Sequence, residues 1–472
     1  MLHFEPYSPE ALKKALPYIR QSPYPCSDVS AGMLFMWQEG ADVRLCVWHD
    51  TFLIRQDYGD QNAFSWPYGA DPDGMLRELA AYARENSLAM RFFAVSPGLL
   101  EEIRADGRFG SVSAACDPRW SDYLYSFEDA ATFRGRKFSG QRNHINRFVK
   151  LYGEPAVRFL RAEDVSRVQA MLSAYEQEHP DGNALERMEL RKTRELLLHT
   201  EELDLPAACL TVGEEIAAFS IGEIIGDTLI IHVEKALKRF EGAYPAMYRG
   251  FVRLVWEKLG HPLRLVNRED DSGDPGLRIS KRQYQPVGLV DKYLVRLDSP
   301  AAALEEVPVL RAGKVVLTPF REEDKAAYLR LNTDAENNRW WGYDYRKDMK
   351  ITGPVDENTF FDAVRFDMRV GDSVNFAIRL EEDGGMIGEV LLWRFTLAGT
   401  AELGCRLFPQ YQGRGYGRAA FSAAADFAGD ALGQKTRARC FLENAASRGM
   451  IEASGFRCVR QDDVYYYFER PE

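Results

Sequence analysis

The sequence predicts an α/β protein with mixed sheets, divided into three units of similar plan. Its 472 residues correspond to roughly three domains of ordinary size. The second and third units share one order of elements: helices, a three-strand meander, a turn, a helix, a strand and a closing loop. This order indicates an internal repeat of architecture. We expect the units at residues 1–150, 151–298 and 310–472.

The composition limits the class of protein. Hydrophobic residues make up 46% of the chain and charged residues 28%, which is typical of a soluble globular protein with a large core. No apolar run approaches the roughly 20 residues that span a bilayer, and the N-terminus lacks the pattern of a signal peptide. The seven cysteines are scattered, without a C-x-x-C pair, which suits reduced thiols. We therefore expect a cytoplasmic protein with no membrane partner and no metal site.

The net charge bears on possible partners. A formal charge of −11 argues against nonspecific nucleic-acid binding as the main role. A local basic surface can still bind RNA. The segment 133–150 is such a candidate, with arginines from Arg134 to Arg147. It is either a solvated helix that joins two domains or a surface that contacts phosphates.

Apolar spacing and turn residues predict the elements of the first two units. In the first unit we expect helices at 10–20 and 74–86 and strands at 43–48, 52–54, 90–95 and 122–126. In the second unit we expect helices at 163–178, 186–199 and 245–259 and strands at 207–212, 216–225, 228–233 and 263–267. The turns Gly213–Glu214 and Gly226–Asp227 favour a hairpin meander. An acidic, glycine-broken loop is expected at 267–278.

The third unit follows a polar, alanine-rich linker at 298–306. Its expected strands are 315–320, 374–380, 386–395, 401–407, 436–442 and 464–468. Its expected helices begin at Glu322, Thr359, the glycine-rich turn and Asn444. We expect an aromatic loop at 338–343 and a turn at Asp383, Gly384 and Gly385.

The glycine-rich turn of the third unit is the main indication of function. Gln412, Gly415 and Gly417 form a Q-x-x-G-x-G pattern, with a further glycine at Gly413. Glycines remove the Cβ atoms that would keep a bulky anion away from the backbone. The following helix directs its free N–H groups and its positive end into the turn. Strand, turn and helix together predict a pyrophosphate cradle, whereas glycines alone are also typical of an ordinary tight turn.

Residues 315–470 resemble the Gcn5-related N-acetyltransferases, in particular the branch that acetylates ribosomal-protein N-termini. The resemblance is carried in order by 317–324, 386–389, 401–404, the Q-x-x-G-x-G turn, 444–447 and Gly455–Phe456. It implies an acetyl-CoA-dependent acyltransferase that acts on an amine of a small molecule, peptide or protein. It implies that the pantetheine lies between the fourth and fifth strands. The implied cofactor-binding residues are Leu407, Gln412, Gly413, Arg414, Gly415, Tyr416, Gly417, Arg418 and Asn444.

Acetyl transfer needs a donor to the thioester oxygen, a proton acceptor for the amine and an acid for the thiolate. The resemblance implies that a backbone N–H in 403–407 supplies the first. Many relatives place a tyrosine acid where this chain has Ile451, whereas the ribosomal-protein branch uses a serine that matches Ser447. Ser447 can equally cap a helix near Asn444.

The proton acceptor is less clear, because all seven histidines lie at or before His261. Glu389 and Glu402 are candidates through a bound water, or they are solvated strand residues. Trp340, Trp341 and Tyr343 form either an acceptor wall or part of an aromatic core.

The first 295 residues resemble an uncharacterised bacterial family related to the catalytic domain of lysylphosphatidylglycerol synthase, which contains two tandem acetyltransferase-like folds. The matching segments are 142–146, 218–223, 232–236, 242–244 and 267–273. The resemblance implies transfer of an acyl or aminoacyl group, the synthase relatives using aminoacyl-tRNA. Tyr244 stands where the glycine signature should end in a small residue, and we expect it to crowd a pyrophosphate.

A polar cluster in the second unit has two interpretations. Its members are Glu223, His232, Glu234, Lys235, Asn267, Glu269 and Asp271. They form either a substrate site or a network that holds the fold together.

These observations predict three acetyltransferase-like folds in tandem. The third would acetylate an amine with acetyl-CoA, and the N-terminal pair would act on an unknown substrate. Two alternatives stay open for the pair: aminoacyl transfer from tRNA, and a binding or regulatory module without turnover. The acceptor and the oligomeric state are left open.

Overall fold

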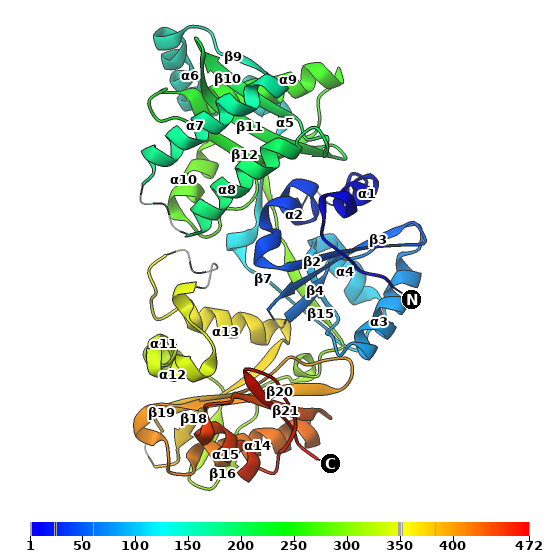
Figure 1. The fold of residues 1–472 in the computed structure, drawn as a ribbon, viewed down its shortest axis with the longest axis vertical. Helices are drawn as coiled ribbons and strands as arrows, with labels where there is room; N and C mark the ends of the chain where they lie inside the picture. The colour runs from blue at the N-terminus through cyan, green and yellow to red at the C-terminus, as the bar shows by residue number, and fades with distance from the viewer. Residues whose placement is uncertain are drawn as a thin grey trace.

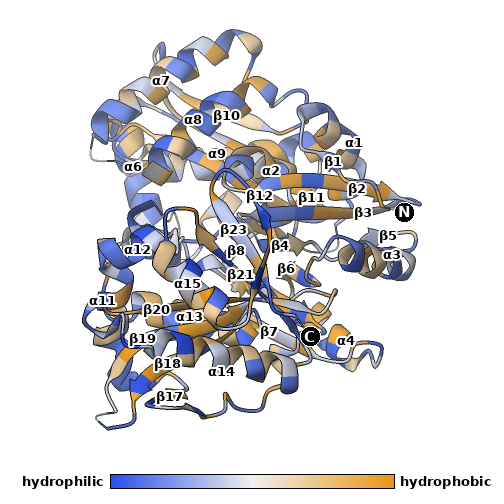
Figure 2. Cartoon of the chain, turned by 60° about the horizontal axis from the view of Figure 1, so that its bottom comes forward, coloured by the Kyte–Doolittle hydropathy of each residue, from blue (hydrophilic) through white to orange (hydrophobic). Residues whose placement is uncertain are grey.

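Three mixed β-sheets flanked by helices make up the protein (Figure 1). The computed structural model describes residues 2–22, 24, 26–59, 61–180, 182, 184–347, 351, 353–382 and 384–471. The second sheet and the third sheet lie at opposite ends of the molecule, with the first sheet at the side between them (Figure 1). Hydrophobic residues follow the strands, while helices such as α7 and α8 carry many hydrophilic residues (Figure 2). The predicted α/β class with mixed sheets is confirmed.

The third sheet carries the glycine-rich turn. Its strands, in sheet order, are β16 (Leu310–Ala312), β17 (Val315–Thr318), β18 (Ser373–Leu380), β19 (Met386–Trp393), β20 (Thr400–Leu407), β21 (Lys435–Phe441), β23 (Tyr465–Glu469) and β22 (Arg457–Gln461). Side chains alternate between the faces of a strand. Val374 and Phe376 therefore pack with α14 (Tyr416–Asp430), whereas Ala377 packs with α11 (Lys325–Thr333) and α13 (Thr359–Val370).

The parallel pair in this sheet is short. Residues 400–402 of β20 pair with residues 435–437 of β21, after which the two strands separate. Beyond this point β21 pairs only with β23 on its other side. Residues 403–407 and 438–441 thus form the two arms of an opening that we call the third-domain fork. The backbone edge of 403–407 that faces β21 has no strand partner there.

The second sheet repeats this plan. Its strands, in sheet order, are β14 (Gly288–Val290), β8 (Asp122–Ser126), β13 (Leu265–Asn267), β12 (Thr228–Ala236), β11 (Glu215–Ile225), β10 (Ala207–Val212) and β9 (Ala156–Phe159). Its helices are α5 (Phe127–Thr132), α6 (Ser139–Tyr152), α7 (Val165–Glu178), α8 (Ala184–His199), α9 (Ala243–Leu259) and α10 (Pro275–Gln283). β12 and β13 pair in parallel over 228–230 and 265–267 and then separate, which forms a second-domain fork. α9 and α14 each follow a glycine with positive φ, Gly242 at 83° and Gly415 at 80°.

The first sheet has the same core. Its strands, in sheet order, are β1 (Glu5–Pro6), β2 (Asp42–Trp48), β3 (Thr51–Tyr58), β4 (Gln61–Phe64), β6 (Arg91–Val95), β15 (Tyr293–Leu297) and β7 (Val112–Cys116), with β5 (Tyr68–Gly69) beside β3. Its helices are α1 (Pro9–Ile19), α2 (Ala31–Trp37), α3 (Pro72–Glu85) and α4 (Pro97–Ala105). The β2–β3–β4 meander, α3 and β6 match the order in the other two sheets, so the repeat extends to the first unit.

The first two sheets exchange their last strands. In the third sheet the last strand, β23, lies between β21 and β22. The equivalent place in the second sheet is filled by β8, which precedes that unit in the chain, and in the first sheet by β15, which follows it. All six neighbour pairs involved are antiparallel. The chain therefore crosses twice between the first two domains.

Because of this exchange, the boundaries of the sheets do not coincide with the expected domain boundaries at residues 150 and 298. The first domain consists of residues up to 116 together with 293–297, and the second sheet spans 122–290. Strand pairing across more than 130 residues leaves no local signal in composition or periodicity, so sequence patterns do not locate these boundaries.

Two predicted loops differ from the structure. The aromatic segment 338–343 lies largely in α12 (Ala335–Trp341), which Asp334 caps at its start. The acidic loop ends earlier than expected, because Asp274 caps α10 with a proline behind it. Of the predicted turn at 383–385, Asp383 lies outside the described residues. Over the described part of the chain, every helix is too short or too polar to cross a membrane.

Candidate acyl-transfer site

The glycine-rich turn of the third domain faces open space. A Cβ atom built on Gly413 or Gly415 would meet no atom within 4 Å, and both residues have positive φ, 71° and 80°. Gly417 is different, because its Cβ would lie 3.2 Å from Met450 Sδ and 3.5 Å from Leu407 Cδ1. The first two glycines thus leave room for a ligand, whereas the third lets α14 pack closely on the sheet.

The turn is electrostatically suited to an anion. The first turn of α14 contains no acidic residue, so its free N–H groups are not balanced by a carboxylate. Arg414 and Arg418 are exposed, and neither forms an ion pair with any residue in the described part of the chain. The charges of Arg414 and Arg418 are repelled by the positive end of the helix, and an anion bound between them would offset this repulsion.

Other predicted cofactor residues hold the turn in place. The Gln412 amide donates to the carbonyl of Leu407 at 3.0 Å and to Asn337 Oδ1 at 3.4 Å. Tyr416 is half-buried against the core under α14. Gln412 therefore fixes the end of β20 relative to α12.

Asn444 and Ser447 lie at the start of α15 (Ala445–Ala453). Asn444 is the N-cap, and its Oδ1 accepts the backbone N–H of Ser447 at 3.0 Å. The capping role thus belongs to Asn444. The half-buried Ser447 hydroxyl makes no hydrogen bond with the described residues and is available to a ligand.

Glu389 lies in a buried ion network. Its Oε1 accepts a hydrogen bond from Arg406 Nε at 2.7 Å, and Glu389 is only 1% exposed. Arg406 also donates to Asn338 Oδ1 at 2.7 Å and Asn332 Oδ1 at 2.9 Å. The guanidinium stabilises the ionised carboxylate, and no solvent reaches it, which favours a structural role over proton transfer from an amine.

Glu402 is also held by arginines. Arg394 Nη1 lies 2.5 Å from its Oε2, and Arg439 Nε lies 3.2 Å from its Oε1. Its side chain is 16% exposed and lies at the closed end of the fork, where β20 and β21 still pair. Glu402 therefore lies before the open arms rather than between them.

The predicted aromatic residues lie beside the fork. Trp341 stacks on the Arg406 guanidinium, 4.7 Å from its ring centre, and its ring fills the space above Gly404. The Trp340 ring lies 6.2 Å from Phe441 on the other arm. All three, including Tyr343, are half-buried. Trp340 and Trp341 thus lie beside the fork, whereas Tyr343 packs against the apolar cluster between α11 and α13.

The polar cluster of the second unit joins two domains. His232 donates from Nε2 to Glu223 at 3.1 Å and from Nδ1 to Glu269 at 2.8 Å. Glu223 in turn accepts the N–H groups of Ala31 and Gly32 at the start of α2, at 3.1 and 2.9 Å. Any Cβ at Gly32 would overlap the His232 ring, so only glycine fits. Burial lowers the pKa of His232, but the two carboxylates outweigh it and raise the pKa to about 9.

Other members of the cluster are also paired. Asn267 donates to the fully buried Asp122 at 2.8 Å, and Lys235 pairs with Glu189 at 2.7 Å. Asp271 accepts from Arg278 and from the Tyr123 hydroxyl. Glu269 has a positive φ of 58°, which is strained for a residue with a side chain. These contacts favour the network interpretation for the cluster as a whole.

The second-domain fork is filled. Glu234 on β12 pairs with Arg268, just after β13, at 3.1 Å, so an ion pair crosses the opening. The Arg268 guanidinium lies 4.4 Å from the ring centres of both Tyr248 and Tyr284. Tyr244 lies on the first turn of α9 and is 37% exposed. The residue that occupies the fork is therefore Arg268 and not Tyr244.

The turn before α9 is covered as well. A Cβ on Gly242 would overlap the carbonyl oxygen of His144, which lies in α6. Tyr152 Oη of the same helix donates to Arg239 O at 2.9 Å, and Arg147 pairs with Glu241. The basic helix α6 therefore lies on the turn that is open in the third domain.

Comparison with family models divides the chain in two. Residues 21–296 match the model described as phosphatidylglycerol lysyltransferase, C-terminal. The chain belongs to this family. Residues 314–457 match the acetyltransferase (GNAT) domain. The resemblances predicted from the sequence are confirmed, and the fold is that of tandem acetyltransferase-like domains.

Parts of the chain are also similar to individual proteins. A conserved protein of unknown function from Bacteroides thetaiotaomicron is 27% identical, with a TM-score of 0.57, over 63% of this chain and 100% of that chain. Mycobacterium smegmatis RimJ, solved in complex with CoA-disulfide, is 23% identical, with a TM-score of 0.29, over 34% of this chain and 85% of that one. An uncharacterized protein of Mycoplasmoides gallisepticum is 22% identical over 178 residues, so the chain spans 56% of that relative's length.

The family assignment gives each half a general chemistry. The GNAT domain supports acyl transfer in the third domain, and the lysyltransferase match of the N-terminal pair fits aminoacyl transfer. The geometry distinguishes the two halves: the glycine turn is open in the GNAT domain, whereas the equivalent region of the lysyltransferase-family domain is closed by Arg268 and α6.

Three residues escaped sequence reasoning. Arg406 and Arg268 pair with carboxylates on neighbouring strands, and Gly32 admits the His232 ring. An arginine at a buried strand position beside a glutamate was the available signal for Arg406. Arg268 and Gly32 acquire their roles only through contacts between distant segments.

Proposed function

We propose that the third domain transfers the acetyl group of acetyl-CoA to an amine. The open glycine turn at the start of α14, with its two unpaired arginines beside the fork, carries this proposal. Acetyl-CoA would supply the thioester. The backbone N–H groups after Gly413 and the side chains of Arg414 and Arg418 would hold its phosphates. The free backbone edge of 403–407 would bind the acyl oxygen.

Proton transfer in this proposal uses few side chains. The Ser447 hydroxyl is free to donate to the departing thiolate, which is already a fair leaving group since thiol pKa values are near 8.5. Glu389 and Glu402 are held by guanidiniums, so we assign neither as the direct base. The neutral fraction of the amine would react, against the wall of Trp340, Trp341 and Tyr343, and the proton that its nitrogen loses as the amide forms would pass to solvent water. The acceptor class stays broad: a small molecule, a peptide or a protein terminus.

Reversing the charge of both loop arginines tests the proposal. We expect the double variant Arg414→Glu, Arg418→Glu to bind acetyl-CoA at least about 100-fold more weakly, because each charge-assisted contact contributes about 1.5–3 kcal/mol. Isothermal titration calorimetry on the full chain measures this. The control is Arg457→Glu, an exposed arginine of β22 in the same domain, which should bind within about threefold of wild type. Wild-type protein that binds no acetyl-CoA at millimolar concentration would exclude the proposal.

Helix α6 and the residues before it support a second function, which would belong to the N-terminal pair of domains. Arg134 and Arg136 are exposed and form no ion pair with described residues, on the segment that covers the closed turn. We infer that this surface binds the acceptor arm or backbone of an aminoacyl-tRNA. tRNA binding is measured over a range of salt concentrations. The slope of log affinity against log salt concentration should be smaller in magnitude by about one to two units in the variant Arg134→Glu, Arg136→Glu. An unchanged slope would leave the pair as a module without tRNA.

A further inference from the structure

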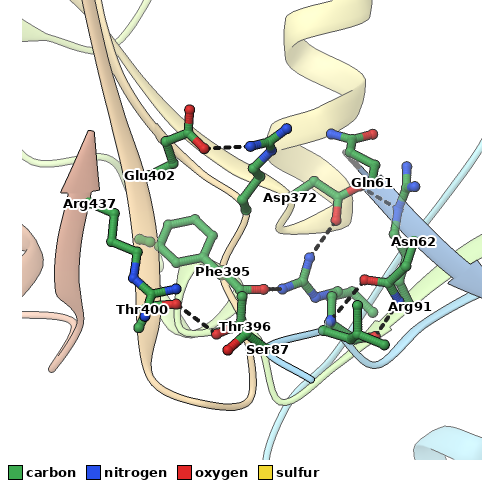
Figure 3. A pocket seen from close by; sticks show the side chains of 15 residues that line it. Gln61, Asn62, Ser87, Arg91, Asp372, Phe395, Thr396, Thr400, Glu402 and Arg437 are labelled. Carbon is green, nitrogen blue, oxygen red and sulfur yellow. Dashed lines mark hydrogen bonds and ion pairs between the residues drawn. The ribbon is translucent and has the colours of Figure 1, made fainter. Parts of the chain in front are cut away.

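A polar cavity lies between the first and third domains (Figure 3). Its volume is about 230 Å³, which equals that of seven or eight water molecules at about 30 Å³ each. β4, β6, the segment 87–89 and Arg296 of the exchanged strand β15 form the first-domain wall. Asp372, the β19–β20 connection and the facing ends of β20 and β21 form the third-domain wall. The backbone bond from Leu397 N–H to Leu88 O, 3.0 Å, closes the domains around it.

The cavity has more positive than negative side chains. Arg91, Arg296, Arg394 and Arg437 line it, against Asp372 and Glu402. One carboxylate of the third domain serves two guanidiniums of the first: Asp372 lies 2.8 Å from Arg91 Nε and 2.7 Å from Arg296 Nη1. Arg296 and Asp372 are 4% and 3% exposed. One buried positive charge is thus left without a partner carboxylate, which is costly in a medium of low polarity.

Arg296 retains an unused donor. Its Nε is buried and donates to no acceptor in the described part of the chain, although its other nitrogens bind Asp372 and the carbonyl of Phe395. Burial, together with Arg91 nearby, lowers the pKa of this guanidinium, which nevertheless stays protonated at neutral pH. An acceptor group is therefore missing from the neighbourhood of a buried cation.

The opposite wall adds a cation and hydroxyl groups. Arg437 is half-exposed and pairs with Glu469 at its rim, 3.1 Å away. The hydroxyls of Thr396 and Thr400 lie 2.9 Å apart, and Ser87 lies on the facing segment (Figure 3). Guanidinium and hydroxyl donors around a small space match the oxygens of a tetrahedral oxyanion.

We propose that this cavity binds a small phosphate oxyanion, either inorganic phosphate or a compact phosphate ester, which neutralises the excess charge and ties the first domain to the third. The site is separate from the glycine turn, because it lies at the closed end of the fork, around residues 400–402. An anion there would brace the base of β20 and β21 through Thr400 and Arg437. The N-terminal pair would thereby be coupled to the acyltransferase domain.

Calorimetric titration of the full chain tests this site. Sodium phosphate and glycerol 3-phosphate are titrated separately at matched ionic strength in chloride buffer. We expect saturable binding of at least one, which identifies the source. Arg91→Gln should weaken it at least tenfold and still fold, because Asp372 keeps Arg296 as its partner. Thr396→Val, which changes no charge, should weaken it about three- to tenfold.

Two further variants separate this site from others. Arg108→Gln, an exposed arginine of the first domain paired with Asp73 and Asp106, should bind as wild type does. The loop variant Arg414→Glu, Arg418→Glu should also retain binding. The proposal is overturned if wild type binds neither ligand, or if Arg91→Gln binds normally while the loop variant does not.

Discussion

Replacing Arg406 by methionine should destabilise the third domain by about 3–5 kcal/mol. The change leaves Glu389 as a buried carboxylate without a counter-charge, and it leaves the amide oxygens of Asn332 and Asn338 without their donors. Trp341 also loses the cation on which it stacks. Since Arg406 connects β20, β19, α11 and α12, the loss should spread over the wall of the fork.

Peptide-resolved hydrogen exchange measures this effect in the full chain. Amides of β19 and β20 should exchange at least about 100-fold faster, because about 1.4 kcal/mol corresponds to a factor of ten. The double variant Glu389→Gln, Arg406→Met should recover part of the loss, since it removes both charges. Unchanged protection of Met386–Trp393 in the single variant would show that the ion network contributes little.

Raising the pH from 6.5 to 9 should weaken the contact between the first two domains. The folded pKa of His232, about 9, is above the ordinary value of 6.5, so its protonated form stabilises the folded state. This stabilisation is complete below about pH 6.5 and is lost as the pH rises through 9. The rise of the His232 pKa from 6.5 to about 9 corresponds to at most roughly 3–4 kcal/mol.

Urea unfolding of the full chain between pH 6.5 and 9.5 tests this expectation. His232→Gln should flatten the pH dependence, because no ring proton is then lost between Glu223 and Glu269. His199→Gln is the matched control, since His199 pairs only with the exposed Glu202. A wild-type protein whose stability does not fall over this interval would show that His232 is neutral in the folded state.

The sequence alone located most elements that are built from local patterns. The meander at 207–236, the strand 401–407 and the helix after Gly415 follow from alternation, hairpin turns and glycine chemistry, which act within a few residues. The open glycine turn before α14 was predictable for the same reason, because Gln412 to Gly417 are contiguous. Asp274 followed by proline is also a local signal for the start of α10, although the acidic, glycine-rich composition of 267–278 predicts a loop there.

Only the tertiary structure decided which predicted residues meet. In the sequence Glu389 is a possible base, yet Arg406 pairs with it from the neighbouring strand, and Asn332 and Asn338 hold Arg406 in place from two helices. Arg268 closes the second-domain fork through a contact across more than 30 residues. β8 and β15 change places between sheets through pairings across more than 130 residues. The periodicity of apolar residues indicates which face of a helix or strand is buried, but it does not indicate which other element packs against that face. The local conformation of the glycine turn therefore followed from the sequence, whereas packing between distant segments determined that one fork is open and the other is closed.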